Sequence, residues 1–242
     1  MKKAILCVKE LCKTYNKGKI WTVENISFNI NEGEIVGLVG RNGAGKSTIL
    51  KSITGILSFE KGEVSILGYN NEKEPINAKK NLGYVPDVSN AFSKMTGMEY
   101  LNFVADIFNV NKIERQNKIS EFEKFFPLKD ALNKMIESYS HGMKQKISIM
   151  ASLISSPKLW ILDEPTTGLD HQTTQNLIKF MQNYAKRGNA VLFSSHNLDI
   201  VDKISDRIVM INHGTIVLDE KLKTLLNKKD FTLEKFFMEK CK

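Results

Sequence analysis

The stretch Gly40–Ser47, with the sequence GRNGAGKS, restricts the fold of this 242-residue chain more than any other feature. It fits the pattern G-x-x-x-x-G-K-[ST], follows the apolar run Ile35–Val39 and precedes a helical pattern over Thr48–Ile56. Glycines let a loop turn its N–H groups inward at a helix N-terminus, where anions are favoured. We therefore expect a strand, a phosphate-binding loop and a helix in succession.

This pattern makes every residue of the loop a candidate ligand for a nucleotide. We expect Lys46 to reach the terminal phosphates and the Ser47 hydroxyl to bind magnesium. The predicted nucleotide-binding residues of the loop are Gly40, Arg41, Asn42, Gly43, Ala44, Gly45, Lys46, Ser47 and Thr48.

Short apolar runs alternate with helical segments through most of the chain, a pattern typical of an α/β fold with a mainly parallel sheet. The predicted strands beyond Ile35–Val39 are Leu82–Val85, Leu159–Leu162, Ala190–Phe193 and Ile208–Ile211. Trp21–Ile30 alternates as a half-buried strand, and Thr215–Leu218 can form a closing hairpin after a turn. We expect a P-loop NTPase core with an N-terminal antiparallel β portion.

The middle of the chain changes to helical periodicity, which predicts an inserted helical subdomain over residues 87–156. The interpretation is a single domain over 1–242. Its α/β nucleotide-binding core comprises 1–86 and 157–218, and a lysine-rich helical tail occupies 219–242.

Composition excludes several classes of protein. Hydrophobic residues make up 42% and charged residues 26%, as in ordinary globular proteins. No apolar run reaches about 18 residues, and Lys9 and Glu10 interrupt the first apolar stretch, so we expect a soluble, non-exported chain. The net charge of +8 is spread along the chain and favours a solvated basic surface over a nucleic-acid or membrane patch. Cys7, Cys12 and Cys241 indicate a reducing compartment without disulfides or zinc.

A second candidate site follows the apolar run Leu159–Leu162, which ends in two acids, Asp163 and Glu164. A strand parallel to the first would bring Asp163 beside the phosphates, where it could hold a metal through water. Glu164 would then orient or deprotonate the attacking water. Adjacent carboxylates at a strand end are costly to bury without a cation, which favours function over packing.

Further motifs resemble the nucleotide-binding subunits of ABC (ATP-binding cassette) transporters, and the likeness covers nearly the whole chain. Gly40–Ser47 corresponds to Walker A, and Leu159–Asp163 with Glu164 to Walker B. Thr166–Asp170 resembles the D-loop, and Ser195-His196 the switch histidine.

The stretch Tyr139–Lys146 corresponds to the family signature, and its Ser140 stands 23 residues before Asp163, the family's usual gap. From the residues alone it is a helix start with Ser140 as N-cap. The resemblance implies that Ser140 and Gly142 bind the γ-phosphate of ATP held by another protomer. His141 departs from the consensus, and taken alone it is typical of a surface histidine.

The resemblance assigns two more residues. Tyr15 stands where the family keeps an aromatic that stacks on adenine. Gly83–Asp87 occupies the Q-loop, where Asp87 replaces the usual glutamine; its carboxylate suits magnesium. The metal set is thus Ser47, Asp163 and Asp87, and the catalytic set is Glu164, His196 and Lys46.

The family implies ATP and Mg²⁺ as cofactors, a head-to-tail dimer with a second ABC ATPase subunit, and a transmembrane permease docked near Asp87–Tyr100. It implies a cytoplasmic protein, peripheral on the inner face of the membrane, with no nucleic acid expected. Phe231–Phe237 resembles the closing segment of drug, antibiotic or bacteriocin export ATPases.

Two alternatives remain open at this stage. One is a soluble ABC ATPase that acts as an assembly or nucleic-acid-linked switch. The other is a different P-loop enzyme, such as a small-molecule kinase, in which Ser140–Gln145 and Ser195-His196 have no place.

Overall fold

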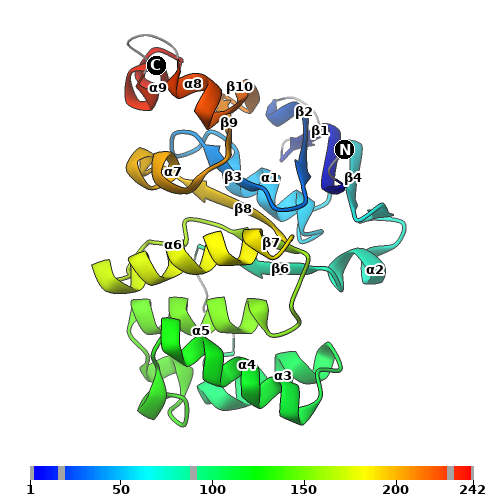
Figure 1. Cartoon of the computed structure of the whole chain (residues 1–242). Helices are drawn as coiled ribbons and strands as arrows, with labels where there is room; N and C mark the ends of the chain where they lie inside the picture. The colour runs from blue at the N-terminus through cyan, green and yellow to red at the C-terminus, as the bar shows by residue number, and fades with distance from the viewer. Residues whose placement is uncertain (1–2, 16–19, 88–91, 228–231, 241–242) are drawn as a thin grey trace.

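Parallel strands buried on both faces run through the centre of the computed structural model, which describes residues 3–15, 20–87, 92–227 and 232–240 (Figure 1). Their order across the sheet is β10-β9-β3-β8-β7-β6, and all neighbours are parallel except β9 and β10. The bounds are β3 (Ile35–Val39), β6 (Leu82–Val85), β7 (Leu159–Leu162), β8 (Ala190–Ser195), β9 (Arg207–Asn212) and β10 (Thr215–Lys221). This sheet confirms the predicted mainly parallel core.

Strand register sets the position of the site. Val85 pairs with Leu162, Leu162 with Phe193, and Val39 with Ser195. The carboxyl ends of β3, β6, β7 and β8 therefore meet at one edge of the sheet, where ligands bind in open α/β folds.

A second sheet, of antiparallel strands in the order β2-β1-β4-β5, confirms the expected N-terminal β portion. Its strands are β1 (Ala4–Thr14), β2 (Trp21–Asn31), β4 (Lys61–Ile66) and β5 (Tyr69–Asn70). The central sheet is apolar on both faces: Val36 and Leu38 of β3 pack in a cluster with this second sheet and α1, whereas Ile35 and Val39 join a cluster with the helices of the other face.

The helices between β6 and β7 gather at one end of the molecule, opposite α8 and α9 (Figure 1). Short 3₁₀ turns at Lys129–Ala131 and Ile136–Ser138 connect α4 to α5. The helices are α1 (Lys46–Ile53), α2 (Pro75–Lys79), α3 (Gly97–Ile107), α4 (Lys112–Phe125), α5 (His141–Leu153), α6 (His171–Lys186), α7 (Leu198–Ile204), α8 (Leu222–Leu226) and α9 (Leu233–Lys240).

Helix α1 differs from the predicted span of Thr48–Ile56 at both ends. It includes Lys46, and it stops at Ile53 because Gly55 adopts a φ of +67°. The N–H groups of Gly55 and Ile56 bond back to the carbonyl oxygens of Ser52 and Lys51, a Schellman motif that ends the helix.

Within the described ranges, no helix is both long and apolar enough to cross a bilayer. Cys7 and Cys12 are free thiols. Cys241, Phe231 and residues 88–91, on which predictions were made, lie outside the described residues.

Candidate active site

The glycine-rich loop joins β3 to α1 in a conformation that its glycines make accessible. Gly43 and Gly45 have φ values of +82° and +107°, a region that side chains rarely allow. A Cβ on Gly45 would lie 2.6 Å from Val23 Cγ1, and one on Gly40 would lie 2.6 Å from the Ile211 carbonyl oxygen. No side chain caps α1, so the N–H groups of its first turn remain available to an anion.

Segments from both ends of the chain hold this loop from behind. The N–H of Gly214, in the turn between β9 and β10, donates to the Ala44 carbonyl oxygen at 3.1 Å. The Gly214 carbonyl in turn accepts from the Glu24 N–H of β2 at 2.8 Å. The loop is thus seated on the β9–β10 turn and on β2.

Lys46 projects its ammonium over the loop rather than into solvent. Its Nζ donates to the Gly40 carbonyl oxygen at 2.8 Å and lies 3.5 Å from Glu164 Oε1, and its side chain is 7% exposed. A cation held over a glycine-rich loop at a helix N-terminus is a phosphate-binding arrangement.

The two acids after β7 are linked through one serine of the neighbouring strand. Ser194 Oγ, at the end of β8, donates to the buried Asp163 Oδ1 at 2.6 Å and accepts from the Glu164 N–H at 2.9 Å. Glu164 has a φ of +47°, which is costly for a residue with a Cβ. This conformation turns Glu164 toward Lys46 while Asp163 stays inside the protein.

His196 completes a chain of charged contacts. The Nδ1 atom of its ring lies 2.9 Å from Glu164 Oε2, and its backbone N–H donates to the same oxygen at 3.4 Å. The predicted catalytic residues Lys46, Glu164 and His196 are therefore consecutive neighbours, with the carboxylate in the middle.

A cleft of about 290 Å³ lies over the loop and brings together most of the predicted site residues. It is lined by Thr22, Arg41, Asn42, Gly43, Gly45, Lys46, Ser47, Thr48, Asp87 and Glu164. Gly40 and Ala44 form the inner side of the loop, and Asp163 is buried. At the margin, the Tyr15 hydroxyl is 3.4 Å from Thr48 Oγ1, and the Tyr15 side chain is exposed where an adenine could stack.

The electrostatics of the cleft fit a divalent cation. Burial raises the pKa of the Asp87 carboxyl, and the charges of Asp163 and Glu164 raise that pKa further. Burial, with the charges of Asp163 and Asp87, raises the pKa of the Tyr84 hydroxyl well above its usual range. This buried hydroxyl has no hydrogen-bond partner among the described residues. Bound Mg²⁺ with its water would relieve the carboxylate repulsion.

Protein side chains alone do not make a metal cage here. Among the residues that the structure describes, no group of three or more His, Cys, Asp or Glu side chains could hold an ion. Magnesium in such a site uses few protein ligands and takes the rest from water and phosphates. Ser47, Asp163 and Asp87 are compatible with that mode of binding.

The signature residues lie elsewhere. Ser140 is the N-cap of α5, and its Oγ accepts from the Met143 N–H at 3.3 Å. Neither Ser140 nor Gly142 is among the described residues that line the cleft. In one protomer, the structure therefore keeps the signature apart from the loop.

Sequence reasoning missed Ser194 and Thr22. Ser194 follows the predicted strand Ala190–Phe193 directly, so its position at the carboxyl end of a strand next to β7 was a usable signal. Thr22 lines the cleft from β2, and nothing in the local sequence distinguishes it from other strand residues.

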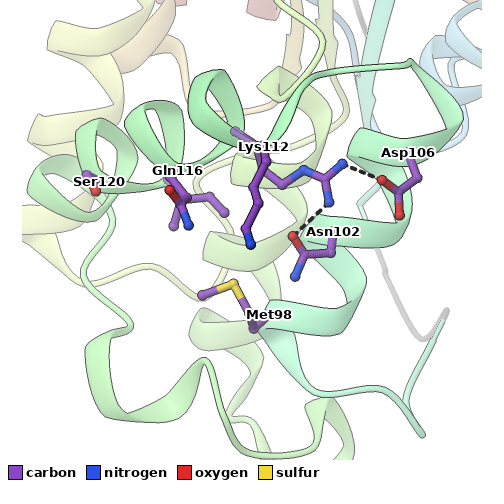
Figure 2. A pocket seen from close by; sticks show the side chains of 8 residues that line it. Met98, Asn102, Asp106, Lys112, Gln116 and Ser120 are labelled. Carbon is purple, nitrogen blue, oxygen red and sulfur yellow. Dashed lines mark hydrogen bonds and ion pairs between the residues drawn. The ribbon is translucent and has the colours of Figure 1, made fainter.

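A larger groove of about 860 Å³ lies between α3 and α4 (Figure 2). Its guanidinium, from Arg115, is already engaged by Asn102 Oδ1 at 3.0 Å, by the Val110 carbonyl at 3.1 Å and by the Asp106 carboxylate. Lys112 extends across the groove toward Met98. The described residues that line this groove include no glycine-rich loop and no pair of adjacent acids, so the cleft over the loop is the better candidate active site.

Comparison with known proteins agrees with this geometry. Residues 23–167 match the family described as ABC transporter. The ATP-binding protein NatA of Bacillus subtilis is 31% identical over 93% of this chain and 92% of its own length. The peptide export ATP-binding protein SkfE of the same organism is 31% identical over 89% of this chain and 88% of its own length. The chain belongs to the ABC transporter family.

Solved structures extend the likeness to nearly the whole fold. An ATP-binding subunit of an ABC transporter superposes with a TM-score of 0.91 at 28% identity, covering 97% of this chain and 98% of that one. The cassette MJ0796, solved as a dimer in a post-hydrolysis state with ADP and Pi, gives 0.79 at 26% identity over 90% and 98%. The chain is an ATP-binding cassette ATPase.

Proposed function

We propose that this chain is the ATPase subunit of an exporter and that two cassettes close head to tail, each binding ATP between its own loop and the other's signature. The contact chain Lys46–Glu164–His196 beside the glycine-rich loop carries this proposal. The separation of Ser140 from the cleft in one protomer supports a second copy, or a related cassette, as the source of the missing half of the site.

The residues of the cleft have complementary roles in this proposal. Lys46 and the loop N–H groups neutralise the phosphates. Glu164 accepts a proton from, or orients, the attacking water, and His196 holds Glu164 and the γ-phosphate in register. Bound Mg²⁺ would be held by Ser47, with Asp163 and Asp87 acting directly or through water, and would supply charge neutralisation.

A membrane partner would dock on the helical end of the molecule. Phe92 and Phe103 are exposed by 43% and 39%, and Phe92 contacts the rings of Phe103 and Tyr100 with centroid distances of 5.4 and 4.9 Å. Exposed apolar surface of this kind marks interaction sites. It overlaps the segment Asp87–Tyr100 predicted to contact a permease, and the protein would accordingly sit at the inner face of the cell membrane.

Export of a drug, antibiotic or peptide is the proposed direction and cargo class. The relative SkfE is described as a peptide export protein, and other relatives are described as linearmycin and doxorubicin resistance proteins. Phe236 and Phe237 of the tail pack partly against the helical core, so the tail is part of the folded cassette.

Substitution of Glu164 tests the catalytic part of the proposal. Glu164→Gln keeps the size of the side chain but removes the charge between Lys46 and His196. We expect ATP turnover to fall at least about 100-fold while ATP still binds. The exposed Glu72→Gln variant is the matched control and should keep wild-type turnover. Normal turnover in Glu164→Gln would remove Glu164 from the mechanism.

Purification of the tagged chain from its native cells, in mild detergent with ATP, tests the transport part. A multi-spanning membrane protein in stoichiometric amount supports the transporter, and its loss on Phe92→Asp and Phe103→Asp substitution supports the docking surface. Soluble partners alone, after crosslinking controls, would favour an assembly switch instead.

A further inference from the structure

The imidazole of His141, at the start of α5, lies directly against Gly168. A Cβ placed on Gly168 would be 2.0 Å from His141 Cδ2 and 2.9 Å from its Nε2, so only glycine fits beneath the ring. Gly168 also has a φ of +76°. The next residue, Gly142, approaches the same glycine: a Cβ on Gly142 would be 2.7 Å from the Gly168 carbonyl oxygen.

Two more residues of α5 contact the loop that contains Gly168. Gln145, one turn after His141, is buried, and its Nε2 donates to the Pro165 carbonyl oxygen at 3.3 Å. Lys146 Nζ lies 3.8 Å from Asp170 Oδ2. Residues four apart share a face of a helix, so one face of α5 contacts the loop 165–170 along its length.

This loop connects the candidate catalytic carboxylate to α6. It begins immediately after Glu164 and ends at Asp170, which caps α6 by accepting from the Thr173 N–H at 2.7 Å. One end of the loop is therefore held at the cleft, by Glu164, and the other at α6, by Asp170. Its middle, at Gly168, is held from the α5 side by the His141 ring.

We propose that His141 is a positioning residue that sets the distance between the signature helix α5 and the loop 165–170. It thereby keeps Ser140 and Glu164 in the relative geometry that the closed dimer needs. This inference rests on the proposed head-to-tail ATPase. The ring acts through shape: it fills the space above a residue that has no side chain. A smaller residue at 141 frees the loop, and a larger residue at 168 displaces the ring.

Three variants of the full-length chain test this role: His141→Gly, Gly168→Ala and the double variant. We expect kcat to fall about threefold to tenfold in His141→Gly and more than tenfold in Gly168→Ala. The double variant should recover part of the loss seen in Gly168→Ala, because the clash has gone and only the backbone strain of a side chain at a φ of +76° remains. His141→Asn, which keeps a planar side chain, should stay within about threefold of wild type.

The affinity of the isolated chain for ATP separates positioning from general damage. His141 and Gly168 are not among the described residues lining the cleft, and the charge of His141 acts only on Asp87 there, so the Kd should change by less than about twofold in all four variants. Wild-type kcat in both single variants, a double variant no better than Gly168→Ala, or an equal loss of ATP affinity would overturn the inference.

Two further outcomes are decisive. If Gly168→Ala fails to fold, recovery of the fold in the double variant supports the contact; if both fail, the kcat of His141→Gly decides, and a wild-type value refutes the inference. The inference and the proposed function fail separately: loss of turnover in Glu164→Gln with wild-type kcat in His141→Gly would reject only the positioning role.

Discussion

Helices α1 and α5 both begin at predicted nucleotide-binding residues, but the two helix starts are built differently. Gly45 precedes α1 and has no side chain to cap it, whereas Ser140 caps α5 with its own hydroxyl. The first residue of α1 is Lys46, with its ammonium buried over the loop. The first residue of α5 is His141, which is exposed and packs on Gly168.

Under the proposed function, the difference accounts for one start that binds a nucleotide alone and one that needs a partner. Uncapped N–H groups with a buried cation offer a phosphate both hydrogen bonds and charge. The start of α5 satisfies one of its own N–H groups and has no buried cation in its first turn, so we expect it to hold a phosphate only when another surface brings it. We therefore propose that each cassette has one strong half-site, at α1, and one weak half-site, at α5.

The largest effect expected is from Lys46→Ala, which removes the buried cation from the strong start. ATP turnover should fall about 100-fold or more, since loss of one preorganised charge contact in an active site costs that much. ATP affinity of the isolated chain should fall with it, measured by equilibrium titration. Lys51→Ala, on the exposed face of the same helix, is the control and should change neither value. Retention of tight ATP binding by Lys46→Ala would contradict the assignment of the strong half-site.

Ser140→Ala should produce an intermediate effect that falls on turnover and spares binding. We expect kcat to drop about tenfold to 100-fold with unchanged ATP affinity of the isolated chain. Loss of the cap should also cost about 1 kcal/mol of stability. Asn111→Ala removes the corresponding cap of α4, where Asn111 accepts from the Glu114 N–H at 2.9 Å, and should lower stability without lowering kcat. If Ser140→Ala and Asn111→Ala gave equal kcat values, the start of α5 would have no role in turnover beyond that of an ordinary helix cap.

The smallest effect concerns the cap of α6, whose charge makes it sensitive to pH. Hydrogen bonds from the Thr173 N–H and hydroxyl lower the pKa of Asp170. A lowered folded-state pKa means that the carboxylate stabilises the fold fully above its unfolded pKa of about 3.9, and loses that contribution as the pH falls through the folded value. Asp170→Asn should therefore flatten the acid side of the Tm profile below about pH 5. The neutral cap Asn197 of α7 gives no such slope. A wild-type acid slope in Asp170→Asn would show that other groups produce it.

Apolar runs bounded by turn residues made the central sheet predictable. Ile35–Val39, Leu82–Val85 and Leu159–Leu162 form strands over those residues, because strands covered on both faces must be apolar throughout. Strands β1 and β4 carry no such signal. Lys9 and Glu10 interrupt β1 at an irregularity in its pairing, and Glu10 there has a φ of +47°. Residues at such a bulge are placed by tertiary contacts rather than by local pattern.

The residues of the candidate site also fall into those that the sequence predicts and those that it does not. Motif spacing and strand order identify the loop and the acids after β7, and the family resemblance identifies His196 after β8. Contacts between side chains that are remote in sequence carry no local signature: Ser194 bridging Asp163 and Glu164, or His141 resting on Gly168. The sequence predicts a surface histidine at position 141. His141 is exposed, but its ring also packs on Gly168 and occupies the space that a Cβ there would need.

The hydrogen bond from Gly214 to Ala44, which supports the glycine-rich loop, has a consequence for synthesis of the chain. The loop itself is complete once residue 47 has left the ribosome, but Gly214, whose N–H supports Ala44, is made almost 170 residues later. Nascent chains emerge at about 5–20 residues per second, so the loop waits on the order of ten seconds or more for its support. The glycine-rich loop is therefore among the first parts of this protein to be made and among the last to be supported.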